Sequence, residues 1–387
     1  MTRTETTHYF GAGPALLPTS VIKQAAEDLI EYQGSGLGLG EISHRSAPAV
    51  AVVDNTKSNI KQLLNVPETH EVFFLQSGGT GEFAAVAYNM LAAFAKKTGK
   101  KGKADYIVTG TWSQKAAEEA KRLGVDVNIV VNGKKSSPTG KYDRIPEPET
   151  WNAFGSAEDT AYVYYCDNET VNGVEFPYVP KVPEGVELVA DMSSNVLSRE
   201  VDVSKFGVIF AGVQKNIGIA GVAVVIIKKL LLEKPSDEEL TALNIPLAPI
   251  VFDFPTLVKN NSLYNTLPIF NLHVVYLTTK LLLDNGGLEV QEAVSNKKAE
   301  KLYATLDSVP EGVFNLLVEK NSRSRMNIVF TVIGGGKEKE FLDGAKAKGM
   351  TGLSGHRSVG GIRISNYNAV SEESIDYVCS WIKEFAS

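Results

Sequence analysis

Lys215 is the side chain whose place in the sequence most favours covalent chemistry. It follows an apolar, β-branched run, Val208–Ala211, that has the composition of a buried strand. A residue just past such a strand lies at the carboxyl edge of the sheet, where α/β proteins bind ligands. A partly desolvated lysine has a lowered pKa and can attack a carbonyl carbon to form an imine. On the local sequence alone, the alternative is a solvent-exposed lysine in a turn.

Two further side chains follow predicted strands and could bind a planar ligand. Asp191 ends the run Glu187–Ala190, and Trp112 comes shortly after Asp105–Val108. The aspartate could bind a metal ion, a ribose or a protonated ring nitrogen, or it could cap a helix. The tryptophan could stack on a ring or pack in the core. Because Lys215 and both of these residues follow strands of one predicted sheet, a shared ligand site is favoured over coincidence.

A glycine-rich turn, Gly78–Gly81, lies between the predicted strand Val72–Gln76 and a helical run. The first N–H groups of a helix and its dipole attract phosphate, so we expect a phosphate site there. A plain turn is one alternative, and a dinucleotide site is another, because Gly79–Ala84 fits the relaxed pattern G-x-G-x-x-A. That pattern also needs an acidic residue closing the next strand, which here ends Val108-Thr-Gly110 without one.

The triplet His-Arg-Ser occurs twice, at residues 44–46 and 356–358, and glycines lie near both copies. Glycine lets the backbone approach a ligand, and arginine binds carboxylate or phosphate through two parallel hydrogen bonds. We therefore expect anion binding, with ordinary surface loops as the alternative. The histidines have no metal-ligand spacing and no serine or cysteine has the context of a nucleophile, so neither a metal nor a triad is predicted. The candidate anion-binding residues are His44, Arg45, His356, Arg357 and Arg363.

The elements that must position these residues alternate between helix and strand from about residue 20 to 230. Short buried strands separated by helices predict an α/β fold, with a mostly parallel sheet covered by helices on both faces. After about residue 270 the pattern changes to long helices and a few strands, and a last helix begins at Ser371. We predict a large domain over residues 18–270 and a smaller α+β C-terminal domain over 271–387, joined by 1–17, with a cleft between them.

Composition limits the classes of partner. The chain has 387 residues, 43% of them hydrophobic, and a net charge of -6, which gives no reason to expect a nucleic-acid or membrane partner. Its longest apolar stretch, Ile217–Ile227, is roughly half of what a membrane helix needs. The N-terminus, Met1–His8, is polar and unlike a secretory signal. With two distant cysteines, Cys166 and Cys379, the sequence predicts a soluble, cytoplasmic protein.

The sequence resembles the phosphoserine aminotransferases, class V aminotransferases with fold type I of the pyridoxal-phosphate enzymes. The spacing suits the eukaryotic, fungal-like branch best. The matching motifs span the chain, and the most specific is Gly355-His-Arg-Ser-Val-Gly-Gly361. The others are Phe10-Gly-Ala-Gly-Pro14, Glu41-Ile-Ser-His-Arg-Ser46, Ser77-Gly-Gly-Thr-Gly81, Asn168-Glu-Thr170, Asp191-Met-Ser-Ser194, Gln214-Lys-Asn216 and Asn265-Thr266.

The resemblance implies a role for each residue toward pyridoxal 5'-phosphate. Lys215 would hold the cofactor as a Schiff base and then move the proton during catalysis. Asp191 would pair with the pyridine nitrogen, Trp112 would stack on the ring, and Thr170 would hydrogen-bond the phenolic oxygen. The cofactor phosphate would be bound by Gly79, Thr80 and Gln214, and by Asn265 and Thr266 contributed by a partner subunit.

The resemblance also implies the reaction and the assembly. Amino transfer from L-glutamate to 3-phosphohydroxypyruvate would give O-phospho-L-serine and 2-oxoglutarate, a step of serine biosynthesis, in a homodimer with shared active sites. Arg363 would bind the substrate α-carboxylate, and the two His-Arg pairs would bind the distal phosphate or γ-carboxylate. Many bacterial members have an arginine where this sequence has Thr80, so one cation toward the substrate phosphate is lost.

Two alternatives remain open on the sequence. Another fold-type-I enzyme, such as an alanine–glyoxylate aminotransferase, would not need two His-Arg pairs. A binding or scaffold protein descended from the enzyme would not need Lys215, Asp191 and Arg363 together.

Overall fold

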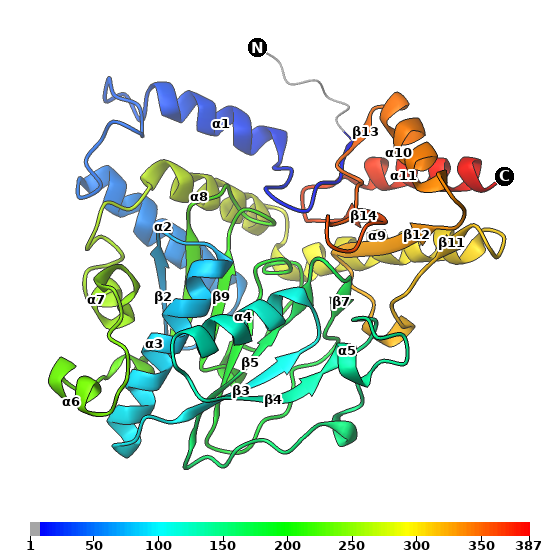
Figure 1. The fold of residues 1–387 in the computed structure, drawn as a ribbon. Coiled ribbons are helices and arrows are strands. Elements are labelled where there is room, and N and C mark those ends of the chain that lie inside the picture. The colour runs from blue at the N-terminus through cyan, green and yellow to red at the C-terminus, as the bar shows by residue number, and fades with distance from the viewer. Residues whose placement is uncertain (1–7) are drawn as a thin grey trace.

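The computed structural model describes residues 8–387 and is built around one seven-stranded sheet (Figure 1). The strands are parallel except β10, which is antiparallel to both of its neighbours. The predicted α/β fold with a mostly parallel sheet is therefore confirmed. In spatial order the strands are β2 (His70–Leu75), β10 (Ala223–Lys228), β9 (Val208–Gly212), β8 (Glu187–Asp191), β5 (Thr160–Cys166), β3 (Lys103–Val108) and β4 (Val127–Asn132).

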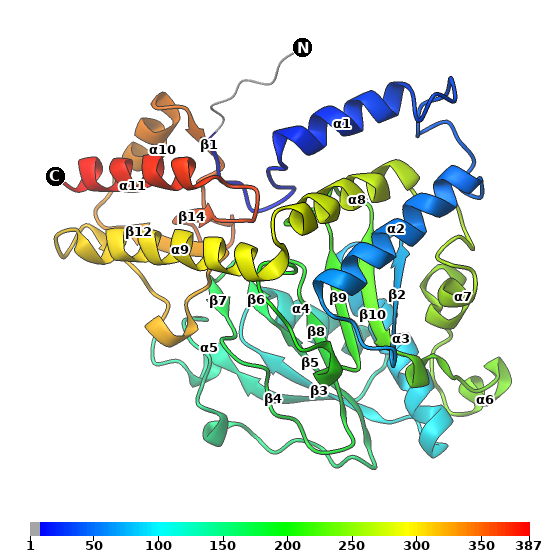
Figure 2. The same ribbon diagram turned by 180° about the vertical axis from the view of Figure 1, so that it is seen from behind.

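Helices cover both faces of this sheet, which explains why its central strands are apolar throughout. Every residue of β5 and β9 is buried, as expected of strands that are covered on both sides. One face packs against α2 (Ala47–Leu63) and α8 (Ile269–Asp284), and the other against α3 (Gly79–Thr98) and α4 (Thr111–Arg122), as the front and back views show (Figures 1 and 2). Helix α1 (Thr19–Ile30) lies outside α8.

The C-terminal part of the chain forms a smaller layer of strands and helices beside the carboxyl edge of the sheet. Its antiparallel sheet has the order β11 (Phe314–Asn315), β12 (Asn327–Val332), β14 (Ile362–Ser365). It packs against α9 (Gly287–Ser308), α10 (Lys337–Ala347) and α11 (Glu372–Ala386) around a core that includes Phe330, Phe341 and Trp381. Ser371 caps α11 by accepting a hydrogen bond from the Ser374 N–H, as the sequence predicts.

The N-terminal segment joins this smaller layer rather than the large sheet. Strand β1 (His8–Tyr9) pairs in parallel with β13 (Met350–Thr351), and Phe10 is buried in the small-domain core. The predicted boundary at residue 270 falls at the start of α8, which packs against α1 and α2 of the large domain. The division into residues 18–270 and the remainder stays a prediction, and residues 1–7 lie outside the described part of the chain.

A buried polar network joins the two domains next to the carboxyl ends of the strands. Asn168 donates hydrogen bonds to Ser194 Oγ (2.7 Å) and to Asn327 Oδ1 (2.8 Å), and Ser324 Oγ donates to Asn168 Oδ1 (2.5 Å). Arg325 of the small domain pairs with the buried Glu175 at 2.7 Å. Because buried polar groups of this kind are costly to leave unpaired, the network holds the domains in one relative position.

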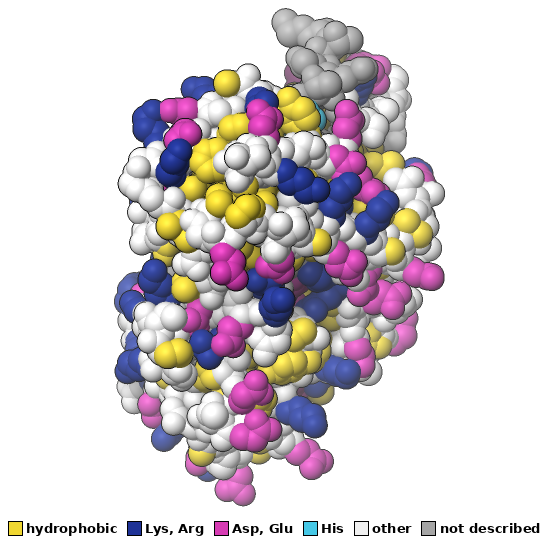
Figure 3. Space-filling view, turned by 90° about the vertical axis from the view of Figure 1, so that its right-hand side faces the viewer, with side chains coloured by type: hydrophobic (Ala, Val, Ile, Leu, Met, Phe, Trp, Pro, Cys, Tyr) yellow, Lys and Arg dark blue, Asp and Glu magenta, His cyan; other side chains and the backbone are white. Residues whose placement is uncertain are grey.

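The remaining elements are short and lie mostly in the connections. No helix within residues 8–387 is long and apolar enough to span a membrane. On the face seen in Figure 3, basic and acidic side chains are interspersed, as is typical of solvated surfaces. The short elements are β6 (Asn168–Glu169), β7 (Val174–Glu175), α5 (Gly133–Ser136), α6 (Asp237–Ala242), α7 (Phe254–Lys259), and the 3-10 helices Pro148–Thr150, Val203–Lys205, Lys229–Leu232, Ile250–Phe252 and Lys320–Ser322.

Candidate active site

A cavity of about 400 Å³ lies where the carboxyl ends of the sheet strands face the small domain. The carboxyl ends of the large sheet, the C-terminal layer and the N-terminal segment all contribute to its walls. The polar and charged side chains are those of Thr80, Trp112, Thr170, Asp191, Ser193, Gln214, Lys215, His356 and Arg363, and the backbone walls are Ala12, Gly13 and Gly78–Gly81.

Lys215 lies in the turn that follows β9, with its amine inside the cavity. Its Nζ donates a hydrogen bond to Thr170 Oγ1 (2.9 Å) and lies 5.6 Å from the centre of the Trp112 ring. Burial lowers the pKa of Lys215, and the nearby Asp191 carboxylate opposes that shift. The turn therefore presents an amine that loses its proton more easily than an ordinary lysine, which is what attack on a carbonyl requires.

Asp191 is the last residue of β8 and is buried at the back of the cavity. It accepts hydrogen bonds from the Ser193 N–H (2.9 Å) and from the Tyr164 hydroxyl (3.4 Å), both of which are neutral donors. Burial raises its pKa, against the hydrogen bonds of Ser193 and the charge of Lys215. A cationic partner would stabilise the ionised form of a carboxylate in this setting. The protonated nitrogen of a bound ring would be such a partner.

The glycine-rich turn forms another wall, at the N-terminus of α3. Gly78 precedes the helix, and Gly79 and Thr80 are its first two residues, whose N–H groups have no partner within the helix. A Cβ at Gly78 would meet no atom within 4 Å, so the space before this terminus is open. The twenty-residue helix points its positive end into the cavity, and the donor set fits a phosphate.

Two residues that line this cavity each have a buried nitrogen atom with no hydrogen-bond partner, namely Trp112 Nε1 and Arg363 Nε. Trp112 is the second residue of α4, and Arg363 lies on β14 and donates to the Thr170 carbonyl at 3.3 Å. Unpaired buried donors are rare in folded proteins, so they indicate a missing acceptor such as a ligand. Together with Lys215 and Asp191, they fit a planar, anionic aldehyde cofactor.

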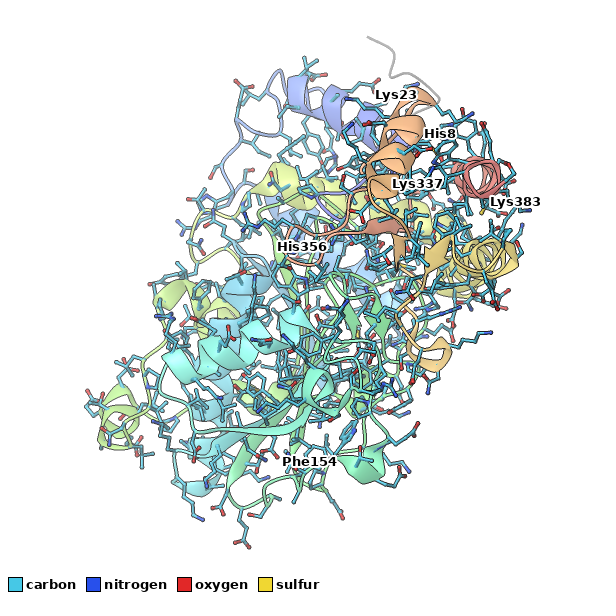
Figure 4. The ribbon with its side chains drawn as sticks, turned by 45° about the vertical axis from the view of Figure 1, so that its right-hand side comes forward. His8, Lys23, Phe154, Lys337, His356 and Lys383 are labelled. Atoms are coloured by element: carbon cyan, nitrogen blue, oxygen red, sulfur yellow. The ribbon has the colours of Figure 1, made fainter. Side chains whose placement is uncertain are left out.

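Besides Arg363, the small domain contributes His356 to the cavity wall. His356 lies on the loop that faces the large domain (Figure 4). Its Nδ1 accepts a hydrogen bond from the Ser358 N–H (3.2 Å), which leaves Nε2 as the ring donor. Burial and the charges of Arg363, Arg357 and Lys115 lower the pKa of His356. This positive surrounding attracts anions to the mouth of the cavity.

Comparison with known proteins decides the family. The class-V aminotransferase model matches residues 7–378. The chain is 50% identical to the phosphoserine aminotransferase of Saccharomyces cerevisiae, over 99% of this chain and 98% of that one. It is 46% identical to the phosphoserine aminotransferase of Drosophila melanogaster, with 94% and 93% covered. The chain belongs to the phosphoserine aminotransferase family.

Solved structures of this family share the fold over the whole chain. Phosphoserine aminotransferase from Bacillus circulans has a TM-score of 0.88 and 36% identity, with 99% of each chain covered. The pyridoxal-phosphate-bound enzyme from Trichomonas vaginalis has a TM-score of 0.87 and 36% identity, with 98% and 100% covered. The predicted fold type I is confirmed. An alanine–glyoxylate aminotransferase from Nostoc sp., at 17% identity and a TM-score of 0.71, shares the fold alone.

Five residues that the family resemblance implicates do not line the cavity of this chain. Arg45 donates to the Tyr264 carbonyl (3.1 Å), and Asn265 donates to Gln76 Oε1 (2.7 Å), so the first His-Arg pair and the Asn-Thr pair lie close together. Arg357 is exposed on the loop that carries His356. For these residues the implied roles stay predictions: His44, Arg45, Asn265, Thr266 and Arg357.

Some residues of the site were not predicted. Ser193 donates its backbone N–H to Asp191. The sequence contains a signal for this residue, because it lies in the family motif Asp191–Ser194. The sequence contains no such signal for Tyr164, because a tyrosine within an apolar strand is typical of the hydrophobic core. Gly13 lies in the family motif Phe10–Pro14, which by itself implies no role for it. A Cβ there would lie 3.0 Å from Lys215 Cγ, so this glycine lets the N-terminal segment lie against the lysine stem.

Proposed function

We propose that this protein is a phosphoserine aminotransferase, with pyridoxal 5'-phosphate as its cofactor. It transfers the amino group of L-glutamate to 3-phosphohydroxypyruvate, giving O-phospho-L-serine and 2-oxoglutarate, a step of serine biosynthesis. The observation that carries the proposal is the buried Lys215 amine, with Asp191 and the α3 N-terminus on the walls of the same cavity. This arrangement occurs in a chain that is 50% identical, over 99% of its length, to a protein named phosphoserine aminotransferase.

The residues of the cavity would hold the cofactor by its separate chemical groups. Asp191 would pair with the ring nitrogen, Trp112 would lie against the ring, and Thr170 would hydrogen-bond the phenolic oxygen. The phosphate would be bound at Gly79, Thr80 and Gln214. When bound, the cofactor supplies an electron sink for the negative charge that develops at the substrate α-carbon.

Lys215 is the group that moves the proton at the substrate α-carbon. Its lowered pKa increases the fraction of free amine that can accept this proton, and the Thr170 hydroxyl at 2.9 Å holds Nζ in the cavity. Arg363 would bind the α-carboxylate, because its guanidinium is held at the cavity wall by the Thr170 carbonyl. One residue, Thr170, thus orients both the amine and the arginine.

The distal end of the substrate must accept a phosphate in one half-reaction and a γ-carboxylate in the other. His356 supplies a donor at the cavity wall, and Arg357 follows it on the same exposed loop. The loop places positive charge near the cavity without enclosing the anion on all sides. Such an open site can accept two anions of different size. We assign His44, Arg45, His356 and Arg357 to this anion site.

The assembly that we propose is a homodimer in which each active site contains residues of both subunits. Its support is the patch formed by Arg45 and the stretch Leu263–Asn265, where Arg45 contacts the Leu263 and Tyr264 carbonyls outside this chain's own cavity. A two-fold axis would carry the patch to the neighbour's cavity, and the neighbour's patch to this one. We also propose a cytoplasmic location, supported by Cys166 and Cys379, which are both free thiols and suit a reducing compartment.

A two-step assay tests the reaction. Purified protein is first treated with L-glutamate alone, and the cofactor spectrum is followed until the amine form accumulates. Excess glutamate is then removed, and 3-phosphohydroxypyruvate, glyoxylate or hydroxypyruvate is added. The proposal expects rapid return of the aldehyde spectrum with the phosphorylated keto acid and return at least tenfold slower with the others, since each charge-assisted hydrogen bond contributes about 1.5–3 kcal/mol. Preference for glyoxylate would indicate the alanine–glyoxylate type, and no spectral change with glutamate would indicate a binding protein.

A further inference from the structure

Helix α4 begins without a capping side chain of its own, although its first turn carries Trp112. The N-cap residue is Gly110, whereas helices usually begin at a residue whose side chain accepts hydrogen bonds from the first free N–H groups. Ser113, the third residue of the helix, bonds back to the Thr109 and Gly110 N–H groups. The N–H groups of the first turn must therefore be satisfied from elsewhere.

Glu169 satisfies two of them from a different part of the chain. Its Oε2 accepts the Trp112 N–H (2.8 Å), and its Oε1 accepts both the Ser113 N–H (2.8 Å) and the Ser113 hydroxyl (2.5 Å). The carboxyl is fully buried. A Cβ at Gly110 would lie 2.2 Å from Glu169 Cδ, so the glycine is required by the carboxyl that packs against it.

The same segment also caps the first residue of the helix and contacts the amine of the active site. Asn172 Oδ1 accepts from the Thr111 N–H (2.9 Å) and hydroxyl (3.0 Å). Between Glu169 and Asn172 lies Thr170, whose hydroxyl accepts from Lys215 Nζ and whose carbonyl accepts from Arg363. One short stretch of backbone is thus attached to Trp112 through Glu169 and to the catalytic groups through Thr170.

We propose that Glu169 is a positioning residue that fixes the Trp112 ring relative to Lys215, by binding the backbone of α4 to the segment that carries Thr170. The proposal rests on the proposed function, in which Trp112 lies against the cofactor ring. Glu169 does not touch the cavity itself. Its action is through the two backbone N–H groups that set where the tryptophan stands.

The chemistry of the site explains why an acid is used there rather than an amide. Three donors point at the two oxygens, and a carboxylate can accept all of them. A glutamine would turn an NH2 group toward an N–H donor, which removes at least one hydrogen bond and brings two donors together. The pKa of Glu169 is raised to about 7, because its burial outweighs the opposing hydrogen bonds from Ser113 and Trp112. Those hydrogen bonds and the helix dipole favour the ionised form.

The test compares Glu169→Gln with a matched control, Asn172→Ala, in the holoenzyme. The control removes two hydrogen bonds from the same helix terminus, but none to Trp112 or Ser113. Thermal stability, the visible circular dichroism of the bound cofactor, the dissociation constant of pyridoxal phosphate, kcat and the KM for glutamate are measured for both. We expect similar losses of stability, with a changed dichroism and an about tenfold lower kcat in Glu169→Gln alone. Its KM for glutamate should change by less than about threefold, because uniform binding is left intact.

A double variant decides whether the effect passes through the tryptophan. In a Trp112→Ala background, Glu169→Gln should alter dichroism and kcat far less than it does in the wild-type background, as coupled residues do in a double-mutant cycle. Equal effects of Glu169→Gln and Asn172→Ala, or an undiminished effect in the Trp112→Ala background, would overturn the proposal. If Glu169→Gln does not fold, Glu169→Asp gives the same comparison, since it keeps the charge but withdraws it by one methylene. The dichroism measurement tests this proposal independently of the proposed reaction. Even if the protein is inactive toward 3-phosphohydroxypyruvate, its visible dichroism still depends on the position of the bound cofactor.

Discussion

The cofactor half of the site and the anion half are built in different ways. Lys215, Asp191 and Trp112 follow strands of one rigid sheet, and the folded chain brings all three to a single cavity. The anion half depends on loops, and of its two His-Arg pairs only His356 lines that cavity. Residues at strand ends are positioned by the sheet of a single chain. Residues on loops can instead contribute to a site in another domain or in another subunit. If this division is real, substitutions in the two halves should change different properties of the enzyme.

Removing the amine should have the largest effect, because it lies in the rigid half and moves the proton itself. Lys215→Ala should lower kcat by at least about 10³-fold, within the range of general acid–base catalysis. Cofactor should still bind, but only non-covalently. In the wild type, borohydride reduction and peptide mapping should find the cofactor attached to Lys215. An adduct on another lysine would contradict the assignment.

Asp191→Asn should come next, with about a hundredfold loss of kcat and an intact fold, since it removes one strong interaction with a charged group. The amide can still accept the Ser193 N–H but cannot keep a ring nitrogen protonated. Steady-state kinetics and the far-ultraviolet dichroism of the variant check both parts. Turnover near the wild-type value would mean that Asp191 does not pair with the ring.

Variants of the loop half should separate substrate binding from cofactor binding. Arg45→Ala and Arg357→Ala should each lower kcat/KM for 3-phosphohydroxypyruvate by about ten- to a hundredfold, the value of one charge-assisted hydrogen bond. The affinity for pyridoxal phosphate should change little, because neither residue lines the cavity of its own chain. The two constants are measured on the same preparations. Loss of cofactor with unchanged substrate efficiency would place these arginines in the other half.

The smallest effect, and the sharpest test of sharing between subunits, is a partial rescue. Inactive Lys215→Ala protein is mixed with an Asn265→Ala/Thr266→Ala variant, and subunits are allowed to exchange. If each site uses both chains, half of the dimers are mixed and each mixed dimer has one intact site, so about a quarter of wild-type activity should return. Light scattering verifies dimers, and mixing each variant with itself is the control. No rescue after verified exchange, or a fully active monomer, would exclude shared sites.

Secondary structure was predictable where periodicity and burial agree. The strands β2, β3, β8 and β9 lie where the apolar runs predict them, within a few residues. Helix α2 was not predicted, although Val52, Val53 and Ile60 recur at helical spacing and are buried in it. The antiparallel direction of β10 had no signal either, because an apolar run does not show which way its strand points.

By itself, the sequence determined which side chains lie at the strand ends. Residue type and position relative to a buried strand made Lys215 and Asp191 candidates, with an alternative left open for each, and the resemblance along the whole chain then implied their roles. Only the tertiary structure decided that Glu169 caps α4, because its partners, Trp112 and Ser113, are 57 and 56 residues away and are bonded through backbone N–H groups. Tyr164 likewise has a role only because β5 and β8 are neighbours. A local pattern records which side chains are buried, but the partner of a buried polar group is fixed only when distant segments pack together.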